Sequence, residues 1–234
     1  MKVIFIFAHP DDETFSSGGT IAKLTKEGIE VKLITATRGE KGLVGDPPVC
    51  KKEDLGRVRE AELHCAAKIL GISQIYFLDY IDGALSKISL LKISRKIQRI
   101  LKKEKPNIVV TFNEEGGSRH PDHIRISRSA TLAFSEYLKT VKKQVRLYYT
   151  ANPRSLIKKF EKLGLGYAAF GRIQGTPDSE ITTIINISDT VRKKIEAGKC
   201  HKTQSKDFNR LLKRRNFIKQ DREYFKLIRE NKIG

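Results

Sequence analysis

The segment Val3-Ile4-Phe5-Ile6-Phe7-Ala8, which runs directly into His9-Pro10-Asp11-Asp12-Glu13, is the part of this sequence that best indicates the fold. Six apolar residues in succession predict a strand that is buried on both faces, as in a parallel sheet covered by helices. The residues after it bring one imidazole and three carboxylates to the place where the strand ends. Because ligands of open α/β sheets bind beyond the carboxyl ends of the strands, this segment also predicts part of a functional site.

A second cluster repeats this arrangement. His120-Pro121-Asp122-His123 follows another apolar run, residues 108–112. The carboxyl ends of parallel strands meet at one edge of a sheet, so two strand ends that each deliver His and Asp predict the two halves of one metal site.

Short β-branched runs alternate with longer helical patterns along the chain, which favours crossover units and a parallel sheet. We predict strands at 3–8, 30–36, 75–78, 108–112, 145–149 and 181–187, and helices at 15–27, 54–70, 89–103, 121–138 and from 189 almost to the end. The predicted fold class is α/β: a Rossmann-like, doubly wound, mainly parallel sheet with helices on both faces and a helical, basic C-terminal extension. We expect one catalytic domain over residues 1–205, and the extension over 206–234, packed on or near it.

Composition narrows the class of protein. The chain has 234 residues, of which 39% are hydrophobic, and no run approaches the ~20 apolar residues of a membrane helix. The N-terminal apolar run ends in acidic residues, unlike a signal peptide, so we expect a cytoplasmic protein. Cys50, Cys65 and Cys200 are odd in number and widely spaced, and we expect ordinary thiols, neither a disulfide framework nor a thiolate zinc site.

The net charge of +19 is large, and residues 189–234 carry 15 Lys and Arg against 6 Asp and Glu. These cations alternate with apolar residues at a spacing typical of amphipathic helices, which favours a solvated basic face. Attraction to anionic lipid, nucleic acid or a phosphorylated substrate is the alternative. No nucleic-acid-binding motif accompanies the charge, so we predict no specific nucleic-acid partner.

The chemistry of the two clusters suits a metal-assisted hydrolysis of an amide or ester. Zinc accepts His nitrogen and carboxylate oxygen, and a catalytic zinc keeps a position open for water. His9 and Asp12 are three residues apart and can point to one ion, which leaves Asp11 to act as general base. Either His120 or His123 could supply the third ligand; we favour His123.

An uncoordinated His120 would stabilise a developing oxyanion and donate a proton to a leaving amine, with Asp122 to orient it. Glu13 would either hold a metal ligand in place or serve as a carboxylate at a helix start. The alternative to a metal site is that these polar residues merely cap two helices.

These residues resemble a known family. Ala8-His9-Pro10-Asp11-Asp12-Glu13 and His120-Pro121-Asp122-His123 look like the signature motifs of the LmbE-like, or PIG-L, zinc-dependent N-acetylglucosamine deacetylases. The resemblance extends over roughly residues 2 to 205 through four further matches: Thr37-Arg38-Gly39-Glu40, Arg57-x-x-Glu60-Ala61, Asp82-Gly83 and Lys199-x-His201-x-x-Gln204. The departure is at the end, where about thirty basic and aromatic residues follow the point at which family chains usually stop.

The resemblance implies an enzyme that releases acetate and a free amine from a small N-acetylated amino sugar. It implies that His9, Asp12 and His123 bind Zn²⁺, with Fe²⁺ as another possible metal, and that Asp11 is the general base. It implies that His120 stabilises the oxyanion and acts as the acid, with Asp122 to orient it. It also implies that Arg57, Asp82 and Arg119 contact the sugar. We expect no membrane span and allow for a homo-oligomer. Two alternatives stay open: an amidase for another N-acyl conjugate, and a basic polyanion or membrane-surface binder on an inactive hydrolase scaffold.

Overall fold

The computed structural model describes residues 1–168, 170–218 and 221–231. These residues form two compact units. Unit 1 contains Met1–Phe7, Ala84–Ile184 and the chain from Tyr224 onward, and unit 2 contains Ala8–Gly83 and Ile185–Glu223. The predicted division at residue 205 stays a prediction, and its C-terminal part includes residues 219, 220 and 232–234, which lie outside the described residues.

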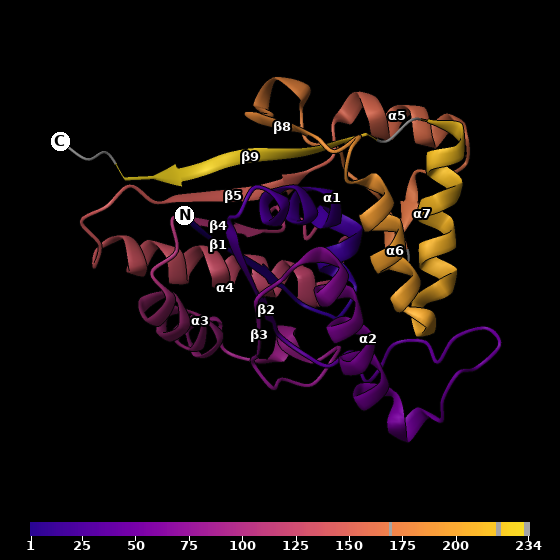
Figure 1. Ribbon diagram of the computed structural model, residues 1–234, viewed down its shortest axis with the longest axis horizontal. Coiled ribbons are helices and arrows are strands. Elements are labelled where there is room, and N and C mark those ends of the chain that lie inside the picture. Colours follow the sequence, from indigo (N-terminus) through magenta and orange to yellow (C-terminus); the bar gives the residue numbers. More distant parts are fainter. Residues whose placement is uncertain (169, 219–220, 232–234) are drawn as a thin grey trace. The chain divides into compact units, whose positions relative to one another are not determined.

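Unit 1 is built on parallel strands. β1 (Lys2–Phe7) pairs with β4 (Ile108–Thr111), and β4 pairs in turn with β5 (Arg146–Ala151), both in parallel. β9 (Arg222–Glu230) lies antiparallel beside β5 (Figure 1). The other elements in this part of the chain are α3 (Leu90–Glu104), α4 (Pro121–Leu138), α5 (Arg154–Lys162), the short strands β6 (Tyr167–Ala168), β7 (Gly171–Arg172) and β8 (Thr183–Asn186), and the 3₁₀ turns η2 (Leu85–Lys87) and η3 (Asp178–Glu180).

The core of unit 1 follows from the apolar pattern. Residues 3–7 of β1 are buried without exception, as expected for a strand covered on both faces. On α3, Ile93, Ile97 and Leu101 recur every four residues and are buried, and α3 packs along α4 (Figure 1). α4 begins with Pro121 at its first position, where a missing backbone N–H costs nothing.

Unit 2 contains α1 (Asp12–Lys26), β2 (Glu30–Thr35), α2 (Leu55–Leu70), β3 (Gln74–Phe77), α6 (Val191–Cys200) and α7 (Ser205–Phe217), with the 3₁₀ turns η1 (Lys52–Asp54) and η4 (Lys202–Gln204). β2 and β3 are parallel, joined through α2 as a crossover unit. α6 packs against both α1 and α2. α2 ends at Gly71, which adopts the left-handed conformation that favours glycine at a helix end.

The predicted α/β class with mainly parallel strand pairing is confirmed. The expected helical extension is correct for α7 and wrong for residues 222–230, which form β9. There, Glu223 and Phe225 are buried in alternation, and the backbone of the strand pairs with β5. Alternation of this kind is the period of a strand, not of a helix. Within the described residues, no helix is long and apolar enough to cross a membrane.

Candidate active site

The first cluster lies in unit 2, where α1 begins. The Oδ2 atom of Asp12 accepts hydrogen bonds from the backbone N–H groups of Ala8 (3.1 Å) and His9 (2.8 Å), and it lies 3.7 Å from Nδ1 of His9. Both side chains are buried. Burial raises the pKa of Asp12 to about 6, although the His9 charge and backbone oppose it. The sharp turn after β1 therefore brings these two potential ligands together, as their spacing predicts.

Asp82 holds the other side of the His9 ring. Its Oδ1 atom lies 3.0 Å from Nε2 of His9, and its Oδ2 atom accepts from the backbone N–H of Lys41 at 3.1 Å. Burial alone would raise the pKa of Asp82, but the hydrogen bond and charge of His9 outweigh it and hold that pKa well below its usual range. Glu40 completes the arrangement by accepting from the backbone N–H of Asp82 at 2.8 Å. The resemblance implies a sugar contact for Asp82; in the structure, its carboxylate contacts His9, a predicted metal ligand.

Asp11 has an unusual backbone and a charged partner. Its φ of 115° lies in a region that residues with a side chain rarely adopt. Its Oδ2 atom lies 3.0 Å from Nη2 of Arg59. Burial raises the pKa of Asp11 to about 7, with the Arg59 charge as the largest opposing influence. A carboxyl group with a pKa near neutrality is suited to accept a proton at neutral pH.

The sequence prediction missed Arg59. This buried α2 side chain donates to the backbone oxygens of Gly39 (2.9 Å) and Pro10 as well as to Asp11. Gly39 has a φ of +68°, and a Cβ there would lie 2.2 Å from Nη1 of Arg59, so both the turn and the close approach require glycine.

Arg57, for which the resemblance implies a sugar contact, is exposed and pairs with Asp54 at 3.1 Å. Arg59-x-x-Glu62 repeats the spacing of Arg57-x-x-Glu60 two residues later. Helical periodicity distinguishes the two pairs, because Arg59 and Glu62 lie on the buried face of α2. That face consists of Leu55, Arg59, Glu62, Leu63, Ala66, Ala67 and Leu70.

Glu13 is the last residue of the first cluster and is fully buried. Its Oε2 atom accepts from the backbone N–H of Asp11 at 3.0 Å, and its Oε1 atom lies 3.0 Å from Nε2 of His201. Burial raises the pKa of Glu13, but the charge and hydrogen bond of His201 outweigh it and lower that pKa overall. Glu13 thus connects Asp11 with His201, and its Oε1 atom also accepts from the hydroxyl of Thr14.

The second cluster lies in unit 1, where α4 begins. Nδ1 of His120 accepts from the backbone N–H of Asp122 at 3.1 Å. Because this nitrogen accepts, the proton of the neutral ring resides on Nε2, which becomes a donor. The carboxylate of Asp122 is buried and accepts from the backbone N–H of Leu85 at 3.1 Å. Orientation of His120 by residue 122 therefore involves the backbone amide.

His123 has the opposite tautomer. Its Nδ1 atom lies 3.0 Å from the carbonyl oxygen of Gly116, which can only accept, so Nδ1 carries the proton and Nε2 presents a lone pair. Metal-binding histidines are oriented in this way. The ring stacks on Phe112, with 4.3 Å between centroids. Gly116 has a φ of +67°, and a Cβ there would lie 2.7 Å from the Cβ of His123, so only glycine fits.

Arg119 directly precedes this cluster and is exposed, with a φ of 65°. Its Nε atom lies 3.9 Å from a carboxylate oxygen of Glu115, which is a weak surface pair. The guanidinium is therefore placed at solvent, where a substrate could reach it.

Comparison with known proteins decides the family. The model of the PIG-L family, described as GlcNAc-PI de-N-acetylase, matches residues 4–134. A 1D-myo-inositol 2-acetamido-2-deoxy-alpha-D-glucopyranoside deacetylase of Saccharomonospora viridis is 31% identical over 230 residues, which cover 86% of this chain and 84% of the relative. The chain belongs to the PIG-L family. The expected resemblance is confirmed, and with it the enzyme class of N-deacetylases.

Solved structures show how widely the fold of this PIG-L protein is used. The N,N'-diacetylchitobiose deacetylase of Pyrococcus horikoshii has a TM-score of 0.68 at 22% identity and covers 97% of this chain and 83% of its own. The 4-carboxy-2-hydroxymuconate hydratase of Pseudomonas putida KT2440 has a TM-score of 0.70 at 17% identity and covers 100% of this chain and 98% of its own. Because the same fold carries a hydratase, the fold alone does not decide the reaction.

The donor groups of this PIG-L protein fit a divalent cation. In the described part of unit 2, the carboxylates of Asp11, Asp12 and Asp82 are gathered around one imidazole and one guanidinium, an excess of negative charge that a cation would balance. In unit 1, Nε2 of His123 presents a lone pair. Imidazole nitrogen and carboxylate oxygen are ligands that zinc accepts.

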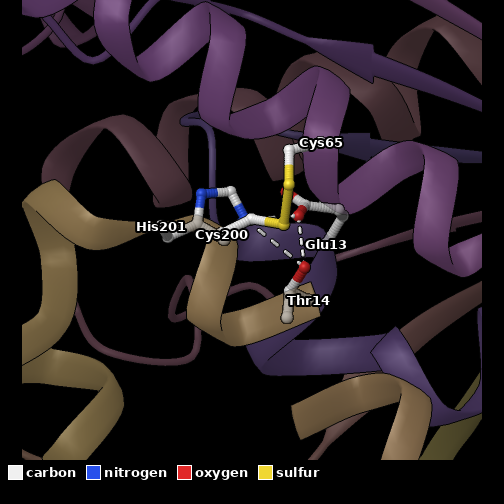
Figure 2. The surroundings of a disulfide bond; sticks show 5 residues. All are labelled: Glu13, Thr14, Cys65, Cys200 and His201. Carbon is white, nitrogen blue, oxygen red and sulfur yellow. Dashed lines mark hydrogen bonds and ion pairs between the residues drawn. A yellow bond between two sulfur atoms is a disulfide. The ribbon is translucent and has the colours of Figure 1, made fainter. Parts of the chain in front are cut away.

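The structure contradicts the prediction of ordinary thiols. Cys65 of α2 and Cys200 of α6 form a disulfide across a sequence separation of 135 residues, as Figure 2 shows, while Cys50 remains a free thiol. Spacing along the chain gave no signal for this pair, because the two helices come together only through the packing of α6 on α2.

Proposed function

We propose that this PIG-L protein is a metal-dependent hydrolase that removes the acetyl group from the N-acetylglucosamine unit of a small molecule, giving acetate and a free amine. The Saccharomonospora viridis relative supports the substrate class through its name, and the family supports the reaction. The observation that carries the proposal is the position of the two clusters, which follow β1 and β4. These strands are parallel neighbours in unit 1, so their carboxyl ends share one edge.

His9, Asp12 and His123 would hold the metal. His9 is two residues beyond the end of β1 in the sequence. Zinc suits this donor set, and ferrous iron is the runner-up because mixed His and carboxylate sites accept several metals. When bound, the ion would polarise the acetyl carbonyl and lower the pKa of a water molecule. Asp82 would keep the His9 ring in place.

Asp11 would take the proton of the attacking water. Its carboxyl group, on a side chain that is 13% exposed, has a pKa of about 7, so it can hold and release a proton near neutral pH. His120 would stabilise the oxyanion, because its Nε2–H group is a donor. To act also as the acid for the leaving amine, His120 must gain a proton on Nδ1, and the hydrogen bond from Asp122 N–H must then break.

The exposed guanidinium groups of Arg57 and Arg119 would bind sugar hydroxyls, with Asp82 offering an acceptor. The cytoplasm remains the location that we propose. Thiol reductants of that compartment would act on the Cys65–Cys200 disulfide, whose Cys65 is exposed. A homo-oligomer is compatible with the proposal but is not required by it.

The test is acetate release from N-acetylglucosaminyl conjugates, compared with bulkier N-acyl conjugates. We expect release that stops with a chelator, returns with Zn²⁺ and is lost in D11N. E196Q, which removes an exposed α6 carboxylate paired with Arg192, is the matched control and should keep full activity. Activity confined to the bulkier conjugates would favour the amidase alternative. Salt-dependent binding to polyanions without any turnover would favour the inactive scaffold.

A further inference from the structure

The proposed mechanism does not use Glu13, although it is the most deeply buried carboxylate of the first cluster, with 0% of its surface exposed. A carboxylate buried this completely needs partners for both oxygens. One oxygen accepts from the backbone N–H of Asp11, and the other faces Nε2 of His201 and the hydroxyl of Thr14. Glu13 thus connects the proposed general base with a residue 188 positions further along the chain.

The backbone of Asp11 needs such support. With a φ of 115°, it is held in a conformation that an aspartate does not choose by itself. The hydrogen bond to Glu13 fixes the direction of its N–H group, and Arg59 fixes its carboxylate. Strained backbone at a catalytic position persists only where the surroundings over-determine it, so the Glu13 bond is part of what aims the Asp11 side chain.

His201 in turn fixes Glu13. Its ring is 0% exposed, and because the Glu13 carboxylate can only accept, Nε2 carries a proton. Without this donor, the oxygen of Glu13 would keep the Thr14 hydroxyl as its described side-chain partner. The burial of a carboxylate that loses its principal donor is strongly disfavoured.

The position of His201 is itself secured by its neighbours. It directly follows Cys200, which the disulfide ties to α2, and Figure 2 shows Glu13, Thr14 and His201 gathered beside that bond. Gly198 in the last turn of α6 lies under the ring of Phe208, so closely that a Cβ there would be 2.0 Å from it. The disulfide and the packing of Gly198 against Phe208 therefore both hold the last turn of α6, which precedes His201.

We propose that Glu13 and His201 are positioning residues for Asp11: the buried His201–Glu13 pair holds the strained backbone that aims the general base. The proposal rests on the proposed function, in which Asp11 is that base. In this proposal, Glu13 of the first motif and His201 of the C-terminal motif act together to position Asp11.

The experiment compares H201L, which removes the donor, with H201Q, whose side-chain amide can donate in its place. We expect H201L to lower kcat roughly 10- to 100-fold, as misplacement of a catalytic group by about 1 Å does. KM and the zinc content should stay within twofold of the wild type, and H201Q should recover most of the kcat. H64L is the matched control, because His64 is an exposed α2 histidine next to Cys65, and it should behave as the wild type.

A second measurement is independent of turnover. Amide hydrogen exchange at residue 11, followed by NMR in zinc-loaded protein, should be faster in H201L than in the wild type and intermediate in H201Q. Should H201L not fold, E13D keeps the charge but shortens the side chain, so that it cannot reach both Asp11 and His201, and the same two losses are expected.

Unchanged kcat and unchanged exchange at residue 11 in H201L or E13D would overturn the positioning role, provided that the wild type releases acetate and D11N does not. Failure of the proposed function has a different signature, since the wild type would then be inactive or D11N as active as the wild type. In that event, the exchange measurement at residue 11 still decides whether His201 and Glu13 hold this backbone.

Discussion

Replacing Arg59 by methionine should damage both stability and catalysis. Arg59 is 3% exposed and donates to Gly39 O, Pro10 O and the Asp11 carboxylate. Methionine fills a similar volume but removes the guanidinium donor from all three acceptors, of which Gly39 O keeps the backbone N–H of Gly42 at 3.0 Å. Removing one partner of a buried ion pair costs about 3–5 kcal/mol, and we expect R59M to lose a free energy of unfolding in that range.

The charge of Arg59 also determines the direction in which R59M should change catalysis. The Arg59 charge is the largest influence that lowers the pKa of Asp11. In R59M that pKa rises, so the acid limb of the kcat/KM profile should move to higher pH and activity at neutral pH should fall.

The assay is urea unfolding, with R57M as the matched control for stability, together with a pH profile of acetate release by R59M and the wild type. Arg57 is exposed and paired only with Asp54 among its described contacts, so R57M should change the free energy of unfolding by no more than about 1 kcal/mol. A loss in R59M below ~1 kcal/mol with an unshifted acid limb would refute the structural role that we assign to Arg59.

Three further predictions concern the metal, the disulfide and the base. The folded-state pKa of Asp11, about 7, lies above its ordinary value of 3.8, so its contribution to stability is fully present below pH 4 and is lost as pH rises toward 7. The free energy of unfolding of the metal-free protein should therefore fall by on the order of 4 kcal/mol over that window, and added Zn²⁺ should restore it. Thermal unfolding measured across this pH range, with and without Zn²⁺, tests both expectations. Reduction of the Cys65–Cys200 disulfide, which closes a long loop, should lower the free energy of unfolding by about 2–5 kcal/mol. Identical unfolding curves with and without reductant would contradict this. C50S, which removes the free thiol, is the control and should respond to reductant as the wild type does. D11N should lower kcat by roughly two to four orders of magnitude with zinc still bound, and a variant with a normal kcat would exclude Asp11 as the base.

Local patterns were sufficient to predict β1, β4 and α4. The apolar runs before His9 and His120 end where β1 and β4 end, and the proline after His120 marks the start of α4. The grouping of His9 with Asp12 also follows from local spacing. What these patterns leave open is which side chains support the site, because that depends on packing.

The disulfide illustrates this, since Cys65 and Cys200 meet only because α6 packs on α2. β9 was missed because a run rich in cations suggested a helix, while its alternation of buried residues is visible only over a few positions. Arg59 was within reach of the sequence: the apolar stripe of α2 includes position 59 and excludes position 57. The partners of Glu13 were not within reach, because His201 is 188 residues away.

In the proposed function, the two motifs hold one metal ion. The most direct test is zinc binding by isothermal titration, with the metal content of the purified protein measured in parallel, for the wild type, H9A, H123A and the exposed control H64L. We expect one ion per chain in the wild type and in H64L, with affinity lost in H9A and in H123A alike. Two independent ions per chain, or unchanged zinc affinity in H123A, would contradict it.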